Sequence, residues 1–250
     1  MRKVAIALLI GASLSACVQT RQYADTQFTP PQGDYRLLVM RPDVTVGSMT
    51  TGGLVEARAD WTETARTKLL TALRAQQSAR GGNVRILERR DSLPGVSAET
   101  IAELERLHNA VGNSIAMHKY MRDDLPTKRR KGLDWTLGRD AVVLGQKTGM
   151  DYALFMHAED SFASTGRVAL QVLGVAGCLV GFCQPDVGGG RQFAYASLVD
   201  LRTGEVVWFN VLQSRIGDIR TDEGAATMVE RLLGRMKPGR DVRRALRSAA

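Results

Sequence analysis

The residues best suited to chemistry in this chain form one short run, His157-Ala158-Glu159-Asp160-Ser161. A histidine, two carboxylates and a hydroxyl are groups that enzymes use for general acid–base catalysis. The run closes an apolar segment over 151–157 that predicts a buried strand. Side chains alternate between the two faces of a strand, so His157 and Asp160 would face opposite ways if the strand continues. We therefore interpret the run as a polar strand edge that passes into a loop, with a hydrolase built on His157 and its neighbouring carboxylates as the alternative.

No other part of the sequence matches a catalytic or metal-binding motif. The chain has three histidines, His108, His118 and His157. It contains no His-Glu-x-x-His, no Gly-x-Ser-x-Gly and no Gly-x-x-x-x-Gly-Lys sequence. His108 falls on the apolar stripe of a predicted helix, where we interpret it as a residue at the edge of the core. His118 is ten positions further along that helix, which is not the spacing of two side chains that bind one metal ion. The sequence therefore predicts no catalytic residue, no metal site and no cofactor.

The N-terminus is typical of an exported protein. Two basic residues precede an apolar run over 4–12, and small residues dominate 13–16. This is the layout of a secretory signal peptide, and the apolar run is too short to span a bilayer. Leu14-Ser15-Ala16-Cys17 resembles the lipobox of bacterial lipoproteins, which implies that Cys17 becomes the acylated N-terminus. Val18, where some relatives have aspartate, implies by the same resemblance an outer-membrane anchor with the domain facing the periplasm.

Charge and size fit one exported domain. Removing Arg2 and Lys3 from the 34 Lys and Arg leaves 32 against 26 Asp and Glu, a net charge of about +6. The chain from Cys17 onward has 234 residues, enough for a domain with a large core. Export and the lack of aromatic residues among the basic ones argue against nucleic acid as a partner. We interpret the run Lys128-Arg129-Arg130-Lys131 as a solvated loop, with contact to an anionic surface, either lipid headgroups or wall polymer, as the alternative.

If Cys17 is acylated, two of the three cysteines remain, Cys178 and Cys183. They are five positions apart, and the periplasm is oxidising, so we expect a disulfide between them. The alternative is a pair of buried thiols that pack as small apolar side chains. A lone Cys-x4-Cys without a nearby histidine is not a zinc ligand set.

Apolar periodicity predicts an α/β domain with a single mixed sheet, flanking helices, and a C-terminal β-hairpin followed by a helix. The expected strands are 35–40, 84–87 and 151–157, the expected helices are 61–77, 97–115, 133–148 and 223–235, and 47–53 is expected as a loop. The hairpin is expected over 193–201 and 206–212, joined by a tight turn. The segment 166–182, uncharged over 168–177, stays open between a buried helix, a pair of strands and a hairpin that contacts a membrane.

The turn of that hairpin carries a family resemblance. Asp200-Leu201-Arg202-Thr203-Gly204-Glu205-Val206-Val207-Trp208 resembles the hairpin of periplasmic lipoproteins related to the curli-secretion subunit and the penicillin-binding-protein activators. A preceding strand like Asp151-Tyr152-Ala153-Leu154, the lipobox and an early strand–helix–strand unit complete the likeness, while 94–132 and the Cys178–Cys183 segment depart from it. The resemblance implies a mixed sheet packed with helices, and a non-catalytic role in envelope assembly, secretion or enzyme activation. It offers no catalytic residues to carry over.

Together these observations predict four parts of the chain. They are a lipoprotein signal peptide over 1–16, a lipidated flexible tether over 17–33, an α/β periplasmic domain over 34–236 and a basic C-terminal tail over 237–250. We expect a membrane-anchored adaptor or activator that binds another envelope protein and that is able to form homo-oligomers. The alternative is a subunit of an oligomeric outer-membrane secretion assembly, which would use 166–183 to meet a membrane or neighbouring subunits.

Overall fold

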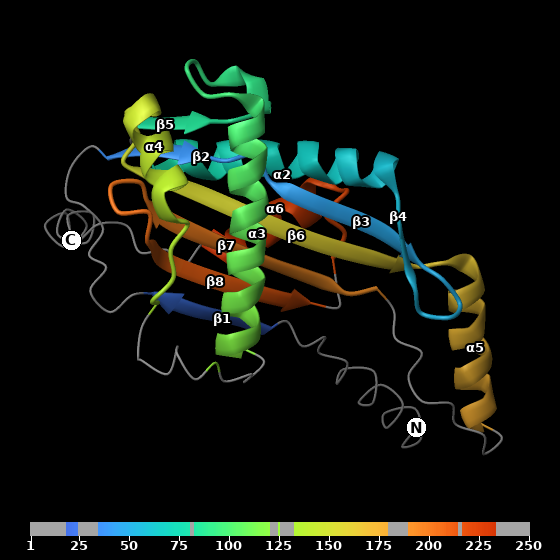
Figure 1. Ribbon diagram of the computed structural model, residues 1–250. Coiled ribbons are helices and arrows are strands. Elements are labelled where there is room, and N and C mark those ends of the chain that lie inside the picture. The colour runs from blue at the N-terminus through green and yellow to red at the C-terminus, as the bar shows by residue number, and fades with distance from the viewer. Residues whose placement is uncertain are drawn as a thin grey trace, which may run out of the picture.

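The computed structural model describes residues 19–24, 35–80, 83–120, 125, 133–179, 190–214 and 217–233. Within these ranges the chain forms one mixed sheet with helices against both faces (Figure 1). The strands are β1 (Gln19–Ala24), β2 (Arg36–Val39), β3 (Asp43–Met49), β4 (Val55–Ala57), β5 (Asn83–Ile86), β6 (Tyr152–Ala163), β7 (Gln192–Asp200) and β8 (Val206–Ser214). The helices are α2 (Ala59–Arg80), the short 3-10 helix η2 (Arg90–Ser92), α3 (Ala98–Tyr120), α4 (Gly138–Thr148), α5 (Thr165–Leu179) and α6 (Asp222–Leu233).

The long strand β6 organises the sheet. Along one side it pairs antiparallel with β7, which continues through β8 to β1. Along its other side it pairs in parallel with two short strands in turn, first β2 and then β3. Pro42 separates those two strands, and proline has no N–H to donate to a ladder. β5 then extends the sheet from β2, and β4 folds back on β3.

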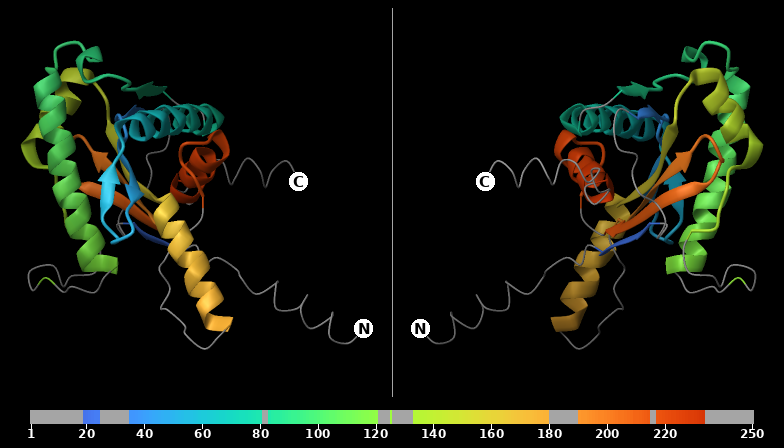
Figure 2. Two further views of the ribbon diagram at one scale, coloured as in Figure 1. Left: turned by 90° about the vertical axis from the view of Figure 1, so that its right-hand side faces the viewer. Right: turned by 90° about the vertical axis from the view of Figure 1, so that its left-hand side faces the viewer.

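Each face of the sheet carries its own core. On one face α2 and α6 cover alternate β6 side chains such as Leu154 and Met156. On the other face α3 and α4 cover the side chains in between, such as Phe155. Figure 2 shows the two helical layers on either side of the sheet. Because both faces are covered, β6 is apolar along most of its length instead of alternating between apolar and polar residues.

The expected fold class is confirmed: a single mixed sheet has flanking helices, and the hairpin β7–β8 precedes the last described helix, α6. Two helix ends follow local capping rules. The Ser97 hydroxyl accepts a hydrogen bond from the Thr100 N–H at 3.1 Å, which caps α3. Gly149 ends α4 with a positive φ of 69° and donates its N–H to the Gly145 carbonyl.

Two stretches expected without regular structure are strands. The prediction of a flexible tether over 17–33 is wrong for residues 19–24, because β1 pairs antiparallel with β8. An open edge strand presents unpaired N–H and C=O groups, and β1 satisfies those of β8. The loop expected over 47–53 is also shorter, because β3 continues to Met49 beside β6.

Three further bounds differ from the expectations. The helix expected over 133–148 begins at Gly138; residues 133–137 precede it without helical structure, and Thr136 forms an isolated bridge with Glu205. The strand expected over 151–157 continues to Ala163, because pairing with β3 and β7 supports it on both sides. The open segment 166–182 is helical within Thr165–Leu179. No helix in the described ranges is long and apolar enough to cross a membrane.

Candidate functional site

His157 lies on the face of β6 that α3 covers, and carboxylates engage both of its ring nitrogens. Nδ1 is 2.8 Å from Oδ2 of Asp43, and Nε2 is 3.2 Å from Oε1 of Glu159. The parallel register of β3 with β6 places Asp43 directly beside His157. Asn109, from α3, donates its Nδ2 to the same Asp43 oxygen at 2.7 Å. We call Asp43, Asn109, His157 and Glu159 the histidine centre.

The histidine centre is an ion triad with the positive charge in the middle. Burial alone lowers the pKa of His157, but the hydrogen bonds and charges of Asp43 and Glu159 outweigh it and raise that pKa to about 9. The hydrogen bond to His157 in turn lowers the pKa of Asp43 and that of Glu159. At neutral pH His157 is therefore protonated and donates from both nitrogens, so it has no lone pair with which to accept a proton from a substrate.

Aromatic packing buries the His157 ring beneath α3. The Tyr195 ring stacks on His157 at 4.9 Å between ring centroids and on Phe209 at 5.5 Å. Its hydroxyl donates to the Asn109 carbonyl at 3.2 Å. α3 approaches this ring through Gly112, where an added Cβ would lie 2.3 Å from a ring carbon. The helix is thus packed directly on the ring, and the histidine centre links α3 to β3 and β6.

His108 makes a second polar contact inside the same layer. Its Nε2 shares a 2.6 Å hydrogen bond with the Ser197 hydroxyl, and its ring stacks on Phe155 at 4.6 Å. Burial, and then the positive charge of His157, lower the pKa of His108 to about 3, so the ring is neutral. A serine beside a neutral histidine is the pair that activates a nucleophile. Here the two residues are only 1% and 2% exposed, so no substrate reaches them, and His108 is in the core rather than at its edge.

The remaining residues of the 157–161 run are divided between the two faces. Asp160 points to the α2 and α6 side, where its Oδ2 accepts from Gln192 Nε2 at 2.9 Å and from the Ile219 N–H at 3.4 Å. Burial raises the pKa of Asp160 to about 7. Ser161 donates its hydroxyl to the Arg191 carbonyl at 3.3 Å. As the alternation predicts, His157 and Asp160 cannot act on one substrate.

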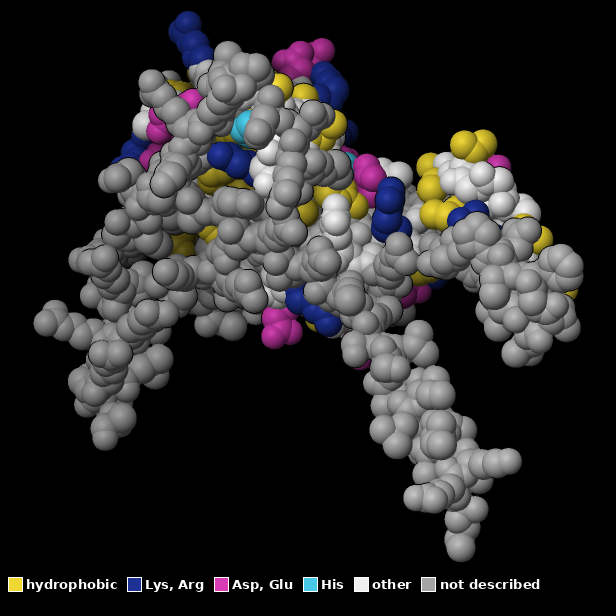
Figure 3. Space-filling model, turned by 90° about the horizontal axis from the view of Figure 1, so that it is seen from below, with side chains coloured by type: hydrophobic (Ala, Val, Ile, Leu, Met, Phe, Trp, Pro, Cys, Tyr) yellow, Lys and Arg dark blue, Asp and Glu magenta, His cyan; other side chains and the backbone are white. Residues whose placement is uncertain are grey.

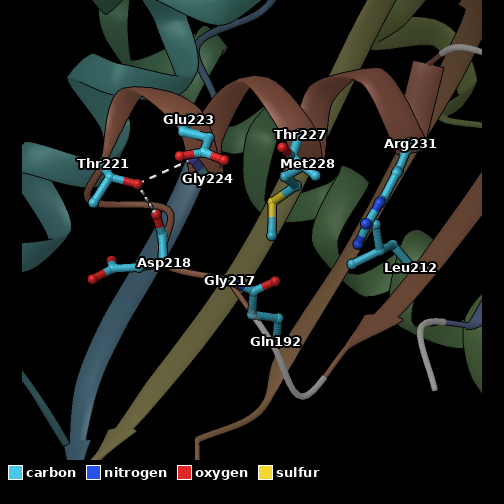
Figure 4. Close-up of a pocket in the computed structure, with 10 residues that line it drawn as sticks. All are labelled: Gln192, Leu212, Gly217, Asp218, Thr221, Glu223, Gly224, Thr227, Met228 and Arg231. Carbon is cyan, nitrogen blue, oxygen red and sulfur yellow. Dashed lines mark hydrogen bonds between the residues drawn. The ribbon is translucent and has the colours of Figure 1, made fainter. Parts of the chain in front are cut away.

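An open pocket of about 360 Å³ lies next to Asp160, between α6 and the adjoining ends of β7 and β8 (Figure 4). Gln192 forms part of its wall and separates it from the Asp160 carboxylate. Asp218, Glu223 and Arg231 contribute charges of both signs. The pocket has no histidine, cysteine or lysine among its lining residues, and its charged and hydroxyl groups make it a polar hollow.

The other prominent feature is α5, which covers neither face of the sheet and projects from its end (Figures 1 and 2). Among its described side chains, four large apolar ones are exposed, Val168, Leu170, Val172 and Leu173. Beside its base, Leu54 at the end of the turn between β3 and β4 and Val55 at the start of β4 are exposed. We call these six residues the apolar end.

The base of α5 is fastened to the turn between β3 and β4. The Ser164 N–H donates to the Met49 carbonyl at 2.9 Å, and Arg167 Nη1 donates to the Thr50 carbonyl at 3.3 Å. α5 and the turn therefore form one surface.

The other sites expected from the sequence fall mostly outside the described residues. Cys17, Cys183 and the basic run 128–131 lie there, and so does the tail 237–250; Cys178 lies in α5. His118 is buried near the end of α3, where its Nδ1 accepts from the Leu125 N–H at 3.0 Å. No group of three or more metal-ligating side chains occurs among the residues that the structure describes.

Sequence reasoning missed Asp43 and Asn109 as partners of His157. Asp43 follows a proline and opens a strand, and Asn109 follows His108 on a helix, so neither position carries a local signal of a charged site. Their meeting depends on which strand pairs beside β6 and on which face α3 packs. The one local signal is the spacing of His157 and Glu159, two positions apart on one strand and therefore on one face.

Comparison with known proteins gives weak structural likenesses. No protein-family model matches the chain, and no curated protein matches it. Among solved structures, a PelC dodecamer from Paraburkholderia phytofirmans is similar with a TM-score of 0.39 and 12% identity, over 90% of this chain and 99% of that one. A variant of that dodecamer is similar with a TM-score of 0.38 and 14% identity, over 88% of this chain and 100% of that one. A lipoprotein from Neisseria meningitidis is similar with a TM-score of 0.30 and 14% identity, over 78% of this chain and 89% of that one. Likenesses of this size do not establish a shared function.

Proposed function

We propose that this protein is a lipid-anchored envelope protein that works by contact with other envelope components and catalyses no reaction. The observation that carries the proposal is the apolar end. α5 adds little to either core of the domain, yet it holds four large apolar side chains in solvent. Contiguous exposed apolar surface of this kind marks a site of interaction.

The histidine centre supports the non-catalytic part of the proposal. Both nitrogens of the protonated His157 are bonded to carboxylates, and Asn109 bonds the nearer carboxylate from α3. The pair His108–Ser197 is enclosed in the core. The groups best suited to acid–base chemistry are thus engaged in holding α3 on the sheet.

The N-terminal sequence supports the anchoring part. Leu14-Ser15-Ala16-Cys17 resembles a lipobox, and Val18 after the cysteine favours the outer membrane with the domain in the periplasm. Two acyl chains are sufficient for stable membrane attachment. The partner expected from the hairpin resemblance is another envelope protein, for which this chain serves as adaptor or activator.

Crosslinking in intact envelopes tests the proposal. The wild-type chain should be recovered from the membrane fraction with acyl mass on Cys17 and should crosslink to a specific envelope protein. A Cys17→Ser chain should lose the acyl mass and should be released from the membrane fraction more readily than the wild type. A His157→Ala chain that folds normally but loses its cellular function would instead support the hydrolase alternative. The native mass of the detergent-extracted protein separates an adaptor, as a monomer or dimer with its partner, from a secretion assembly of many copies.

A further inference from the structure

We infer that α5 and the turn between β3 and β4 enter the lipid leaflet that carries the acyl chains of Cys17. The protein would then hold the membrane at two points and in one orientation. The inference rests on the proposed anchoring for the position of the membrane. It assigns the apolar end to lipid, and not to a groove on another protein.

The distribution of apolar residues around α5 favours lipid. Each residue turns the helix by about 100°, so Val168, Val172, Leu173 and Leu170 occupy an arc of about 200°, which is wider than the stripe of about 100° that packs against one surface. All four are between 39% and 66% exposed. A helix that docks in a protein groove buries one apolar stripe, whereas a continuous apolar medium covers a wider apolar arc in full. The only charged residue of α5 is Arg167, at its base.

The path of β1 places the lipid anchor at the same end of the sheet. Gln19, the first residue of β1, pairs with Gln213 next to the end of β8. The end of β8 pairs with Gln192, which pairs with Asp160, five residues before α5 begins. Cys17 is two residues before Gln19, so covalent geometry keeps it within about 7 Å of that residue. The membrane that holds Cys17 must therefore lie close to the end of the sheet from which α5 projects.

The direction of α5 agrees with this position. In Figures 1 and 2 its far end lies below the level of β1, which is the lower edge of the sheet. Figure 3 views the molecule from that side, and apolar side chains gather at its right, where the turn between β3 and β4 meets α5. Leu54 and Val55 at that turn are 75% and 51% exposed.

The length of α5 matches one leaflet. Fifteen residues make a helix about 22 Å long, against a hydrocarbon core about 30 Å thick. α5 is therefore too short to span the bilayer and long enough to pass the headgroups of one leaflet. Arg167 at its base then lies at headgroup depth, where a cation is attracted to lipid phosphate. Its guanidinium also bonds the Thr50 carbonyl, so the helix and the turn would enter the leaflet together.

Photocrosslinking distinguishes lipid from protein as the occupant. A benzophenone amino acid replaces Val172 or Leu173 in the full-length lipidated protein, which is reconstituted in vesicles of phosphatidylethanolamine and phosphatidylglycerol. Leu107, a partly exposed apolar residue on α3, is the matched control. Lipid adducts at 172 and 173 and none at 107 are expected. Protein adducts at 172 and 173, whether to a second copy or to another protein, would overturn the inference, as would equal lipid labelling at 107.

A second measurement does not depend on acylation. Protein that comprises residues 17–250 with Cys17→Ser is mixed with the same vesicles, with and without the double substitution Val172→Ser and Leu173→Ser. Loss of two buried apolar side chains should weaken vesicle binding about 100-fold. A Leu107→Ser control should bind as the parent does. Equal binding by the parent and the double variant would overturn the inference, while a mature protein without acyl mass would overturn only the proposed anchoring.

Discussion

Replacing His157 by glutamine should destabilise the folded protein by an amount that depends on pH. Glutamine is close to histidine in size and keeps an N–H donor for Asp43, but it has no charge. The variant therefore loses the attraction between the imidazolium and the two carboxylates of the histidine centre. It also loses the stacking on Tyr195, which contributes at every pH.

The size of the effect follows from the pKa of His157, which is raised to about 9 from an ordinary value of 6.5. A tenfold change in proton affinity corresponds to about 1.4 kcal/mol, so the charge interaction adds about 3 kcal/mol to the free energy of unfolding. The side chains of Asp43 and Glu159 are 39% and 59% exposed, so solvent screens part of the charge interaction. We therefore expect the loss of this interaction to lower the free energy of unfolding by about 2 kcal/mol. Because the folded pKa is the higher one, the stabilisation is complete below pH 6.5 and is lost as the pH rises through 9.

Urea unfolding at several pH values, followed by tryptophan fluorescence, measures this difference. Trp208 is buried in the core and reports on the folded state. The gap between wild type and His157→Gln should be largest at pH 6 and should shrink to the stacking contribution at pH 9.5. An Asp43→Asn variant, which removes one of the two partners, should reproduce part of the same pH profile. A gap that is constant from pH 6 to 9.5, or that widens with pH, would refute the reasoning.

Three further substitutions test separate contacts. Burial raises the pKa of Asp160 to about 7, so ionisation of this carboxyl lowers the stability of the folded protein as the pH rises. Asp160→Asn should therefore raise the free energy of unfolding by about 3 kcal/mol at pH 8 and change it little at pH 4. Equal effects at both pH values would contradict the burial argument. Gly112→Ala puts a methyl group against the Tyr195 ring, which should lower the free energy of unfolding by about 1–3 kcal/mol and speed amide hydrogen exchange in α3. Exchange in α3 at the wild-type rate would disprove the close packing. Ser197→Ala leaves His108 without its hydroxyl partner and should lower the free energy of unfolding by about 1–3 kcal/mol in the same urea assay; no loss would show that the hydrogen bond contributes nothing net.

Local patterns were sufficient for most of the elements. The apolar stripe over 97–115 predicted α3, and the apolar strands flanking 202–205 predicted the hairpin of β7 and β8. These signals depend on residues close together in the chain, where capping and turn geometry act. The alternation of side chains along a strand also placed His157 and Asp160 on opposite faces.

Features that depend on distant partners were not predictable in the same way. β1 is a polar segment that becomes a strand because the edge of β8 is open beside it. The extension of β6 to Ala163 depends on β3 and β7 pairing along both sides. In each case the backbone hydrogen bonds come from segments far away in sequence, which a local pattern does not contain.

The sequence by itself determined the α/β class, the hairpin near the C-terminus and the expectation of an anchored exported chain, because periodicity, turn residues and a cleavage motif are local properties. Only the tertiary structure decided what the conspicuous residues do. Parallel pairing of β3 with β6 brought Asp43 to His157, and the packing of α3 added Asn109, so the histidine of a run suited to catalysis became the buried centre of an ion network. The same structure left α5 outside both cores, because a sheet has two faces and other helices already cover them.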